Sequence, residues 1–309
     1  MIYTLTMNPA LDKTVVIPHF SVNEVNRISS LRLDAGGKGI NVSKVLAKLG
    51  SRSRATALLG GSTGKQIREM LEQQGISLDC VEISGRTRTN LKIIDTEGKT
   101  NTDINEPGAA VTEEQAQQLF LRFTNRLTAG DIVVLAGSVP GGIPTDIYAK
   151  YITACRQTGA KAFLDADGEL FAQAVPAHPY LVKPNQDELS RYVNRQLSTL
   201  EEVRAAAMDL VQTGIEKVVV SLGAEGALYV SEQTCLYAPA ISVPVGSTVG
   251  AGDSVVAALA LAEERGLSPE ETMKLASATG AANVMCSGTQ AAEWAQVESL
   301  LTQAVCRLL

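Results

Sequence analysis

The sequence contains few of the residues on which common catalytic and metal sites depend. Its two histidines, His19 and His178, lie far apart and near prolines, so histidine-based acid–base catalysis is not expected. The five cysteines are an odd number and are not paired at short spacing. This is typical of reduced thiols in the cytoplasm rather than of a disulfide framework or a zinc site. If the chain is an enzyme, we expect its base to be a carboxylate.

Excess positive charge and long apolar runs are also missing. The 309 residues carry a formal net charge of −6, which argues against a general nucleic-acid-binding surface. An anionic substrate would therefore need a local cluster of positive charge. No apolar run approaches the length of a membrane span, and residues 1–6 contain no basic leader or cleavage site. We expect a cytoplasmic protein without nucleic-acid or membrane partners.

The chain does contain a regular alternation of short apolar segments and amphipathic segments, which is typical of an α/β fold with a mostly parallel sheet and crossover helices. No linker marks a second full domain, so one domain over residues 1–309 is expected. The predicted strands are 2–7, 55–59, 78–83, 131–136, 162–165, 180–182 and 217–221, with a further strand ending at 230. One helix is predicted to run from about residue 39 to about residue 50. The other predicted helices span 63–74, 112–127, 144–158, 186–193, 199–213, 252–265, 268–286 and 293–307.

Two stretches interrupt this alternation. Within residues 13–33 and 88–104, polar and apolar side chains alternate with the period of a strand, and Thr96-Glu97-Gly98 separates two such runs like a hairpin turn. Short antiparallel strands beside a buried sheet predict a small lid.

A stretch rich in small residues is the main candidate for an active centre. Residues 246–254, GSTVGAGDS, run directly into the apolar segment 255–262, which is predicted to be a buried helix. Glycines before a helix leave its first N–H groups uncovered at the positive end of the dipole, where an anion can bind. Asp253 could act as a base beside that anion. The stretch alone fits a tight turn capped by Asp253 equally well.

The usual nucleotide-binding loops are absent. A Walker A loop needs Gly, four residues and then Gly-Lys-Ser/Thr, but Gly64-Lys65 is followed by Gln66 and position 59 is leucine. A dinucleotide-binding fingerprint needs Gly-x-Gly-x-x-Gly after the first strand, whereas Met7-Asn8-Pro9-Ala10 follows it here. If ATP binds, it binds through a different kind of loop.

Several other motifs lie where ligands bind in open α/β sheets, at the carboxyl ends of strands and the starts of helices. Each alone could be a turn, a helix cap or a solvated strand face. Their shared position favours a ligand site. The motifs are Asn8-Pro9, Gly36-Gly37-Lys38-Gly39, Gly137-Ser138, Lys183-Pro184-Asn185 and Ser221-Leu222-Gly223.

The paired glycine motifs resemble the two signatures of the ribokinase-like carbohydrate kinases of the phosphofructokinase B type. Residues 36–41, GGKGIN, resemble the first signature, and residues 248–254, TVGAGDS, resemble the second. The resemblance extends over residues 2–305. Residues 7–12, MNPALD, and 105–108, NEPG, are similar to the sugar-phosphate branch, especially 1-phosphofructokinases and tagatose-6-phosphate kinases. The minor 6-phosphofructokinase shares much of this pattern.

This resemblance implies a three-layer αβα fold with a β lid and an ATP-dependent kinase that uses Mg²⁺. It implies that Asp253 is the base and that the backbone of Gly250, Ala251 and Gly252 is the anion hole. A homodimer that pairs through the lid is also expected, and the proposed substrate is D-fructose 1-phosphate. The alternatives are tagatose 6-phosphate, fructose 6-phosphate and a non-catalytic sugar-phosphate sensor.

The resemblance also assigns residues to the two substrates. The sugar phosphate is expected to contact Asp12, Arg27, Gly36, Gly37, Lys38, Asn41, Arg88, Asn90 and Ser138. The nucleotide is expected to contact Lys183, Asn185, Ser221, Leu222, Gly223, Ala224, Glu225, Gly226, Gly252 and Ser277. Asn185 and Glu188 are expected to organise Mg²⁺. Ser277 departs from the pattern because many relatives have asparagine there, which puts a side-chain bond to adenine in doubt.

Overall fold

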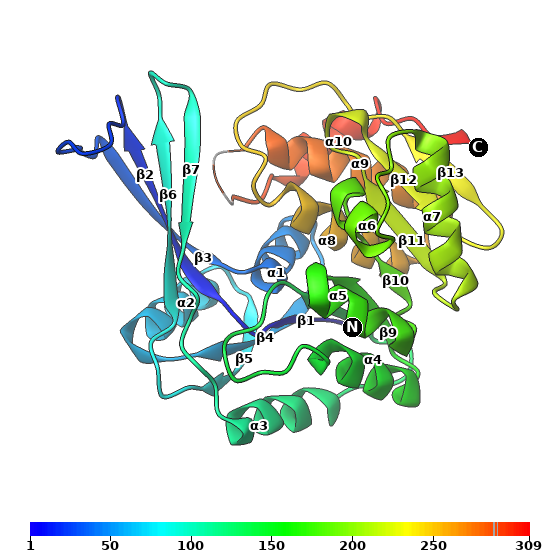
Figure 1. The fold of residues 1–309 in the computed structure, drawn as a ribbon, viewed down its shortest axis with the longest axis horizontal. Helices are drawn as coiled ribbons and strands as arrows, with labels where there is room; N and C mark the ends of the chain where they lie inside the picture. The colour runs from blue at the N-terminus through cyan, green and yellow to red at the C-terminus, as the bar shows by residue number, and fades with distance from the viewer. Residues whose placement is uncertain (287, 289) are drawn as a thin grey trace.

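The apolar segments predicted as strands form a central ten-stranded sheet with the order β14-β13-β12-β11-β10-β9-β8-β1-β4-β5 (Figure 1). The structure is a computed structural model that describes residues 1–286, 288 and 290–309. The parallel strands are β1 (Ile2–Thr6), β4 (Ser53–Leu59), β5 (Ser77–Glu82), β8 (Ile132–Ala136), β9 (Lys161–Asp165), β10 (Leu181–Val182) and β11 (Lys217–Ser221). The antiparallel strands at one edge are β12 (Ala227–Val230), β13 (Cys235–Ala238) and β14 (Arg307–Leu308).

Helices cover both faces of this sheet, which makes three layers. One face packs against α1 (Lys38–Lys48), α2 (Gly61–Gln73), α8 (Ala251–Arg265), α9 (Pro269–Val284) and α10 (Trp294–Leu301). The other face packs against α3 (Glu113–Thr124), α4 (Ile147–Thr158), α5 (Gly168–Ala174), α6 (Gln186–Tyr192) and α7 (Leu200–Gln212). In the described residues, none of the helices combines the length and apolarity that crossing a membrane requires.

The strand sequences are apolar throughout because both faces of the sheet are buried. In β8, Val133 and Leu135 face one core while Ile132 and Val134 face the other, and none of the four is more than 2% exposed. A parallel sheet between two helical layers requires such continuous apolar runs. The buried sheet therefore fixes the positions of the loops that follow its strands.

The interrupted stretches form a second sheet, the lid, which projects from one side of the main body (Figure 1). Its order is β3-β2-β6-β7. The hairpins β2–β3 and β6–β7 are antiparallel as predicted, but the two hairpins join through a parallel β2–β6 pairing. The bounds are β2 (Ala10–Ile17), β3 (Ser30–Gly36), β6 (Arg88–Asp95) and β7 (Thr100–Asn105).

Some predicted bounds were wrong. The helix predicted over 293–307 ends at Leu301, and Arg307–Leu308 instead pairs with the sheet edge at β13. The strand predicted over 27–33 covers residues 30–36 and continues to the start of α1. Helix α5 and strand β13 were not predicted, since both are short and lack a clear hydrophobic period. None of these differences moves a predicted site residue to another end of the sheet.

Candidate active site

A cleft of about 620 Å³ lies where the carboxyl ends of the parallel strands, the start of α8 and the lid meet. Ligands bind at this edge in open α/β sheets because the loops that follow the strands converge there. The chain reaches the cleft from the ends of β1, β8, β9, β10 and β11, through Thr6, Ala136, Asp165, Lys183 and Ser221.

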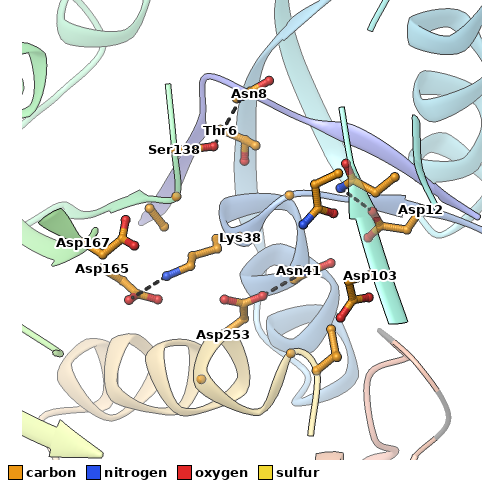
Figure 2. A pocket seen from close by; sticks show the side chains of 18 of the residues that line it. Thr6, Asn8, Asp12, Lys38, Asn41, Asp103, Ser138, Asp165, Asp167 and Asp253 are labelled. Carbon is orange, nitrogen blue, oxygen red and sulfur yellow. Dashed lines mark hydrogen bonds and ion pairs between the residues drawn. The ribbon is translucent and has the colours of Figure 1, made fainter. Parts of the chain in front are cut away.

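Asp253 lies in the first turn of α8 and faces this cleft (Figure 2). Its side chain is buried, and the Asn41 amide of α1 donates a 2.8 Å hydrogen bond to its Oδ2. Burial and, to a smaller extent, the charge of Asp165 raise the pKa of Asp253 to about 6. A carboxylate with this pKa is mostly ionised at neutral pH and can accept a proton more readily than an exposed aspartate can.

The start of α8 offers backbone donors beside Asp253. The helix begins after Gly250, which has a φ of 82°, a conformation that glycine adopts without strain. Gly250 and Gly252 line the cleft, and a Cβ on Gly252 would lie 3.5 Å from Lys183 Nζ. Ala251 is not among the lining residues, and its N–H already donates to Thr248 O at 3.4 Å. The first turn of α8 and Lys183 together have the chemistry to hold an anion.

Asp165 holds two lysines at the floor of the cleft. Its Oδ1 lies 3.2 Å from Lys38 Nζ and 3.4 Å from Lys183 Nζ. Burial opposes the charge of Asp165, but Lys183 and Lys38 outweigh it and hold the pKa of the carboxyl below its ordinary value. Burial also opposes the charge of Lys38, and there the nearby carboxylates raise its pKa above the ordinary value. The charged forms of Asp165 and Lys38 therefore stabilise each other.

The lining of the cleft is not a simple positive patch. Among the described residues that line it, four are basic and six are acidic. The sequence led us to expect a local cluster of positive charge, and Lys38 and Lys183 do converge. Their two positive charges are, however, already partly offset by the single negative charge of Asp165.

The lid contributes a second carboxylate on the opposite wall. Asp12 of β2 accepts a 3.0 Å hydrogen bond from the Asn90 amide of β6, and burial raises the pKa of Asp12 above its ordinary value. Gly36 lies directly against this carboxylate, since a Cβ at that position would be 2.0 Å from Asp12 Oδ2. Glycine is needed there to let the backbone approach the Asp12 side chain.

Arg88 lies at the base of the lid and lines the cleft. Its Nη1 donates to Glu106 O at 2.9 Å, and its Nη2 donates to Asn8 O at 3.0 Å. The guanidinium fork therefore braces two backbone segments, and Nε is the buried nitrogen that has no acceptor among the described residues. Asn8 in turn donates to Ser138 Oγ at 3.3 Å (Figure 2).

Buried polar atoms without partners gather in this cleft. Most buried polar groups in proteins are hydrogen-bonded, so each exception calls for an explanation. Among the described residues, several orphaned atoms belong to side chains that line the cleft, which suggests that a polar ligand satisfies them. They are Thr6 Oγ1, Asn41 Oδ1, Arg88 Nε, Asn90 Oδ1 and Lys92 Nζ.

Asn185 and Glu188 form a capping box at the start of α6. Asn185 Oδ1 accepts from the Glu188 N–H, and Glu188 Oε2 accepts from the Asn185 N–H, both at 2.8 Å. Both residues also line the cleft together with Asp165 and Asp167. In the described part of the chain, no cluster of three or more His, Cys, Asp or Glu side chains forms a metal cage. This donor set fits Mg²⁺, which keeps much of its water and binds few protein carboxylates.

The structure brings most of the predicted site residues into one cleft. Asp12, Gly37, Lys38, Asn41, Arg88, Asn90, Ser138, Lys183, Asn185, Glu188, Ser221, Gly250, Gly252 and Asp253 line it. The remaining predicted residues are not in its lining: Arg27, which is exposed, Gly36, Leu222, Gly223, Ala224, Glu225, Gly226, Ala251 and Ser277. Of these, Gly36, Leu222 and Ala251 directly adjoin lining residues in the sequence.

Sequence reasoning missed several lining residues. Asp165 ends a predicted strand and Asp167 follows it, so their position at a strand end was a signal that could have identified them. Thr14, Lys92, Asp103 and Asn105 lie in the lid strands, where only the cross-strand register reveals that they face the cleft.

A mostly parallel sheet between helical layers, with a β lid beside a cleft at its carboxyl edge, is the ribokinase-like fold of carbohydrate kinases. The family model for pfkB family carbohydrate kinases matches residues 5–296, and the chain belongs to this family. It is thus a phosphotransferase that acts on a sugar hydroxyl.

Individual relatives agree with this membership. The chain is 40% identical to the 1-phosphofructokinase of Rhodobacter capsulatus, over 90% of this chain and 88% of the relative. It is 33% identical to the tagatose-6-phosphate kinase of Staphylococcus epidermidis, over 92% of each chain. Among solved structures, phosphofructokinase-2 from Escherichia coli in complex with substrates and products superimposes with a TM-score of 0.94, at 34% identity and 98% coverage of both chains.

Proposed function

We propose that this kinase transfers the γ-phosphoryl group of ATP to D-fructose 1-phosphate and gives fructose 1,6-bisphosphate. The observation that carries the proposal is the position of Asp253. This buried carboxylate lies beside the start of α8 and faces the same cleft as the lid pair Asp12–Asn90. The similarity to curated 1-phosphofructokinases at 35–40% identity supports the choice of sugar.

In this proposal Asp253 accepts the proton of the sugar hydroxyl as that oxygen attacks the γ-phosphorus. Phosphoryl transfer depends mainly on positioning and charge stabilisation. Asn41 keeps the Asp253 carboxylate oriented through its 2.8 Å hydrogen bond. Asp12 and Asn90 bind sugar hydroxyls, because a carboxylate accepts and an amide both donates and accepts. Arg88 and Ser138 lie beside the phosphate that the sugar already carries.

The nucleotide occupies the other side of Asp253. Its phosphates approach the first turn of α8, where Gly250, Gly252 and Lys183 would balance the charge that grows on the transferred group. Residues 221–226, at the end of β11, and Ser277 of α9 would lie along the nucleotide. The N–H of Ala251 is partly used by Thr248 O, so we assign the anion hole mainly to its two glycine neighbours.

Mg²⁺ is proposed to bind near Glu188 and Asn185. When bound, it would neutralise part of the charge on the ATP phosphates. The capping box fixes the orientation of both side chains. Their oxygens would accept hydrogen bonds from the water molecules of a hydrated ion. This arrangement would also offset the excess of acidic groups in the cleft.

We further propose that the protein is a homodimer that pairs through the lid. The lid has two edge strands, β3 and β7, and β7 is exposed along its whole length. Exposed edges and apolar surface promote association. Apolar side chains are exposed on and around the lid strands: Val22, Val25, Ile28, Leu31 and Ile104. Sedimentation of the wild type and Leu31→Glu tests this, since the variant should be a monomer; a monomeric wild type would refute it.

The substrate is tested with a panel of fructose 1-phosphate, fructose 6-phosphate and tagatose 6-phosphate, compared by kcat/KM with saturating ATP and Mg²⁺. We expect fructose 1-phosphate to give the highest value. A higher value for either 6-phosphate would assign the chain to that activity instead. The highest activity on a sugar without phosphate would contradict the whole sugar-phosphate assignment.

A further inference from the structure

We propose that Lys92 and Asp103 form a specificity-determining pair, which reads the hydroxyls of the sugar ring and sets the preference among ketohexose phosphates. This inference rests on the proposed function, because it concerns how the same cleft selects its sugar. Neither residue belongs to a motif that the sequence analysis singled out.

The register of the lid strands places Lys92 and Asp103 in a row of cross-strand neighbours that differs from the row containing Asp12 and Asn90. Asp12, Asn90 and Asn105 are cross-strand neighbours on β2, β6 and β7, and they form a first polar row. Thr14, Lys92 and Asp103 form a second row two residues further along the same strands. Side chains two apart on a strand share a face, and both rows line the cleft. Figure 2 shows Asp12 and Asp103 on the same side of the cleft, across from Lys38 and Asp165.

Lys92 is an unusual residue for an inner strand of the lid, because lysine is rarely buried. It is only 9% exposed, and its Nζ lies 3.2 Å from Asp103 Oδ1. Among the described residues, this buried Nζ has no hydrogen-bond acceptor with suitable geometry, so the contact with Asp103 is an ion pair alone. An ammonium group has three donors to satisfy. A buried lysine left in this state can donate to a ligand in the cleft.

The pair has the chemistry that neighbouring sugar hydroxyls require. Lys92 can donate, and the half-exposed Asp103 carboxylate can accept, so together they match a hydroxyl pair in either direction. The second row lies roughly 6.6 Å along the strands from the first. One bound sugar phosphate can therefore contact Asp12 and Asn90 with one part of its ring and this pair with another.

The position of the pair bears on which sugar phosphate is preferred. With the reacting hydroxyl at Asp253 and the existing phosphate at the far end, the fructose 1- and 6-phosphates bind as the same ring turned end for end. They then differ in where the ring presents its anomeric hydroxyl. Polar groups on the lid wall can sense this difference, whereas the charges at Asp165 and the start of α8 serve the phosphoryl transfer common to both. A mismatch leaves buried polar atoms unpaired, which is the stronger source of discrimination.

The experiment compares wild type with Lys92→Met, which keeps the length of the side chain but removes its donors. The measured quantity is the ratio of kcat/KM for fructose 1-phosphate to that for fructose 6-phosphate, together with the KM for ATP. We expect the ratio to fall by about tenfold or more, the scale of one hydrogen bond to a charged group, with the KM for ATP unchanged. Asp103→Asn should shift the ratio in the same direction, and its half-exposed side chain makes this variant safe for folding.

Lys13→Met is the matched control. Lys13 lies between Asp12 and Thr14 on β2, so strand alternation turns it to the opposite face, and it does not line the cleft. Its ratio should equal that of the wild type. An unchanged ratio in active Lys92→Met and Asp103→Asn enzymes overturns the pair while the kinase assignment stands.

Calorimetric titration separates this proposal from the proposed function. Fructose 1-phosphate should bind more weakly to Lys92→Met than to wild type in the absence of ATP. If wild type binds the sugar but does not phosphorylate it, the proposed function fails and the loss of affinity still supports the pair. If the two proteins bind it equally, or wild type does not bind it, the pair is refuted.

Discussion

A helical layer of the main body and the lid each present a carboxylate held by an asparagine amide, but the two carboxylates have different surroundings. Asn41 holds Asp253 at 2.8 Å, and Asn90 holds Asp12 at 3.0 Å. Asp253 lies in the first turn of a helix, near Lys38 and Lys183. Asp12 lies in β2, an inner strand of the lid, where Lys44 and Arg88 supply the nearby positive charge.

The difference teaches how a similar local pair can serve two tasks. A helix N-terminus and nearby lysines stabilise negative charge that develops during a reaction. These surroundings support our proposal that Asp253 is the base in phosphoryl transfer. The lid wall offers mainly donors and acceptors in register, which suit hydroxyl groups. We therefore expect damage to Asp253 to affect turnover and damage to Asp12 to affect sugar binding.

The largest effect is expected for Asp253→Asn, which keeps the shape of the side chain but removes the base. We expect kcat to fall by about 10²-fold or more, as is typical for loss of a general base, with little change in the affinity for the sugar phosphate. Steady-state kinetics and calorimetry measure the two quantities. Unchanged turnover would show that Asp253 is not the base, and a catalytically silent wild type that still binds sugar phosphate would favour a sensor.

Asp12→Asn should give the opposite pattern. We expect kcat/KM for the sugar phosphate to fall by about ten- to a hundredfold, mainly through KM, because an acceptor of sugar hydroxyls is lost. The KM for ATP should stay near its wild-type value. A fall confined to kcat would contradict the proposal that Asp253 acts in turnover and Asp12 in sugar binding.

Arg88→Ala should have a smaller effect on the same side of the cleft. We expect the KM for the sugar phosphate to rise by about tenfold, more than the KM for ATP, because Nε is the donor left for a ligand. The exposed neighbour Arg86→Ala serves as the control. Equal increases in both KM values would mean that Arg88 mainly braces the carbonyls of Asn8 and Glu106.

The smallest effect is expected from a moderate change of pH. The pKa of Asp253 is raised to about 6, so the ionised base is lost as the pH falls through this value and kcat/KM should be halved near pH 6. Phosphate groups on the substrates titrate in the same range. The control is therefore the residual activity of Asp253→Asn, whose profile should fall less steeply below pH 6. Identical profiles would contradict the role of this carboxylate.

The sequence was sufficient to predict the parts of the fold that follow from local patterns. Continuous apolar runs such as β8 predict a sheet buried on both faces, and glycines before α8 predict an anion site at its start. Polar residues at strand ends were gathered correctly because parallel strands bring their carboxyl ends to one edge. Lys183, which follows β10, and Ser221, which ends β11, are examples.

Contacts across strands could not be predicted in the same way. Asp12 and Asn90 were both identified, but their hydrogen bond depends on a parallel pairing of strands 78 residues apart in sequence. The antiparallel register of β6 and β7 likewise places Lys92 beside Asp103. The predicted end of the helix at 307 was wrong because helical spacing alone did not reveal that the helix ends at Leu301 and that Arg307 pairs with the sheet edge. Local patterns carry no information about such partners.

The carboxylate of Asp165 has a consequence for how the enzyme responds to ionic strength. Lys38 and Lys183 share one counter-ion that is built into the chain, so part of their charge is neutralised before a phosphate binds and fewer solvent ions are displaced on binding. We therefore expect the KM for Mg²⁺-ATP to vary only weakly between low and moderate salt, in contrast to sites where exposed lysines attract an anion through screened charge. A steep rise of KM with added potassium chloride would show that the lysines are not neutralised in this way.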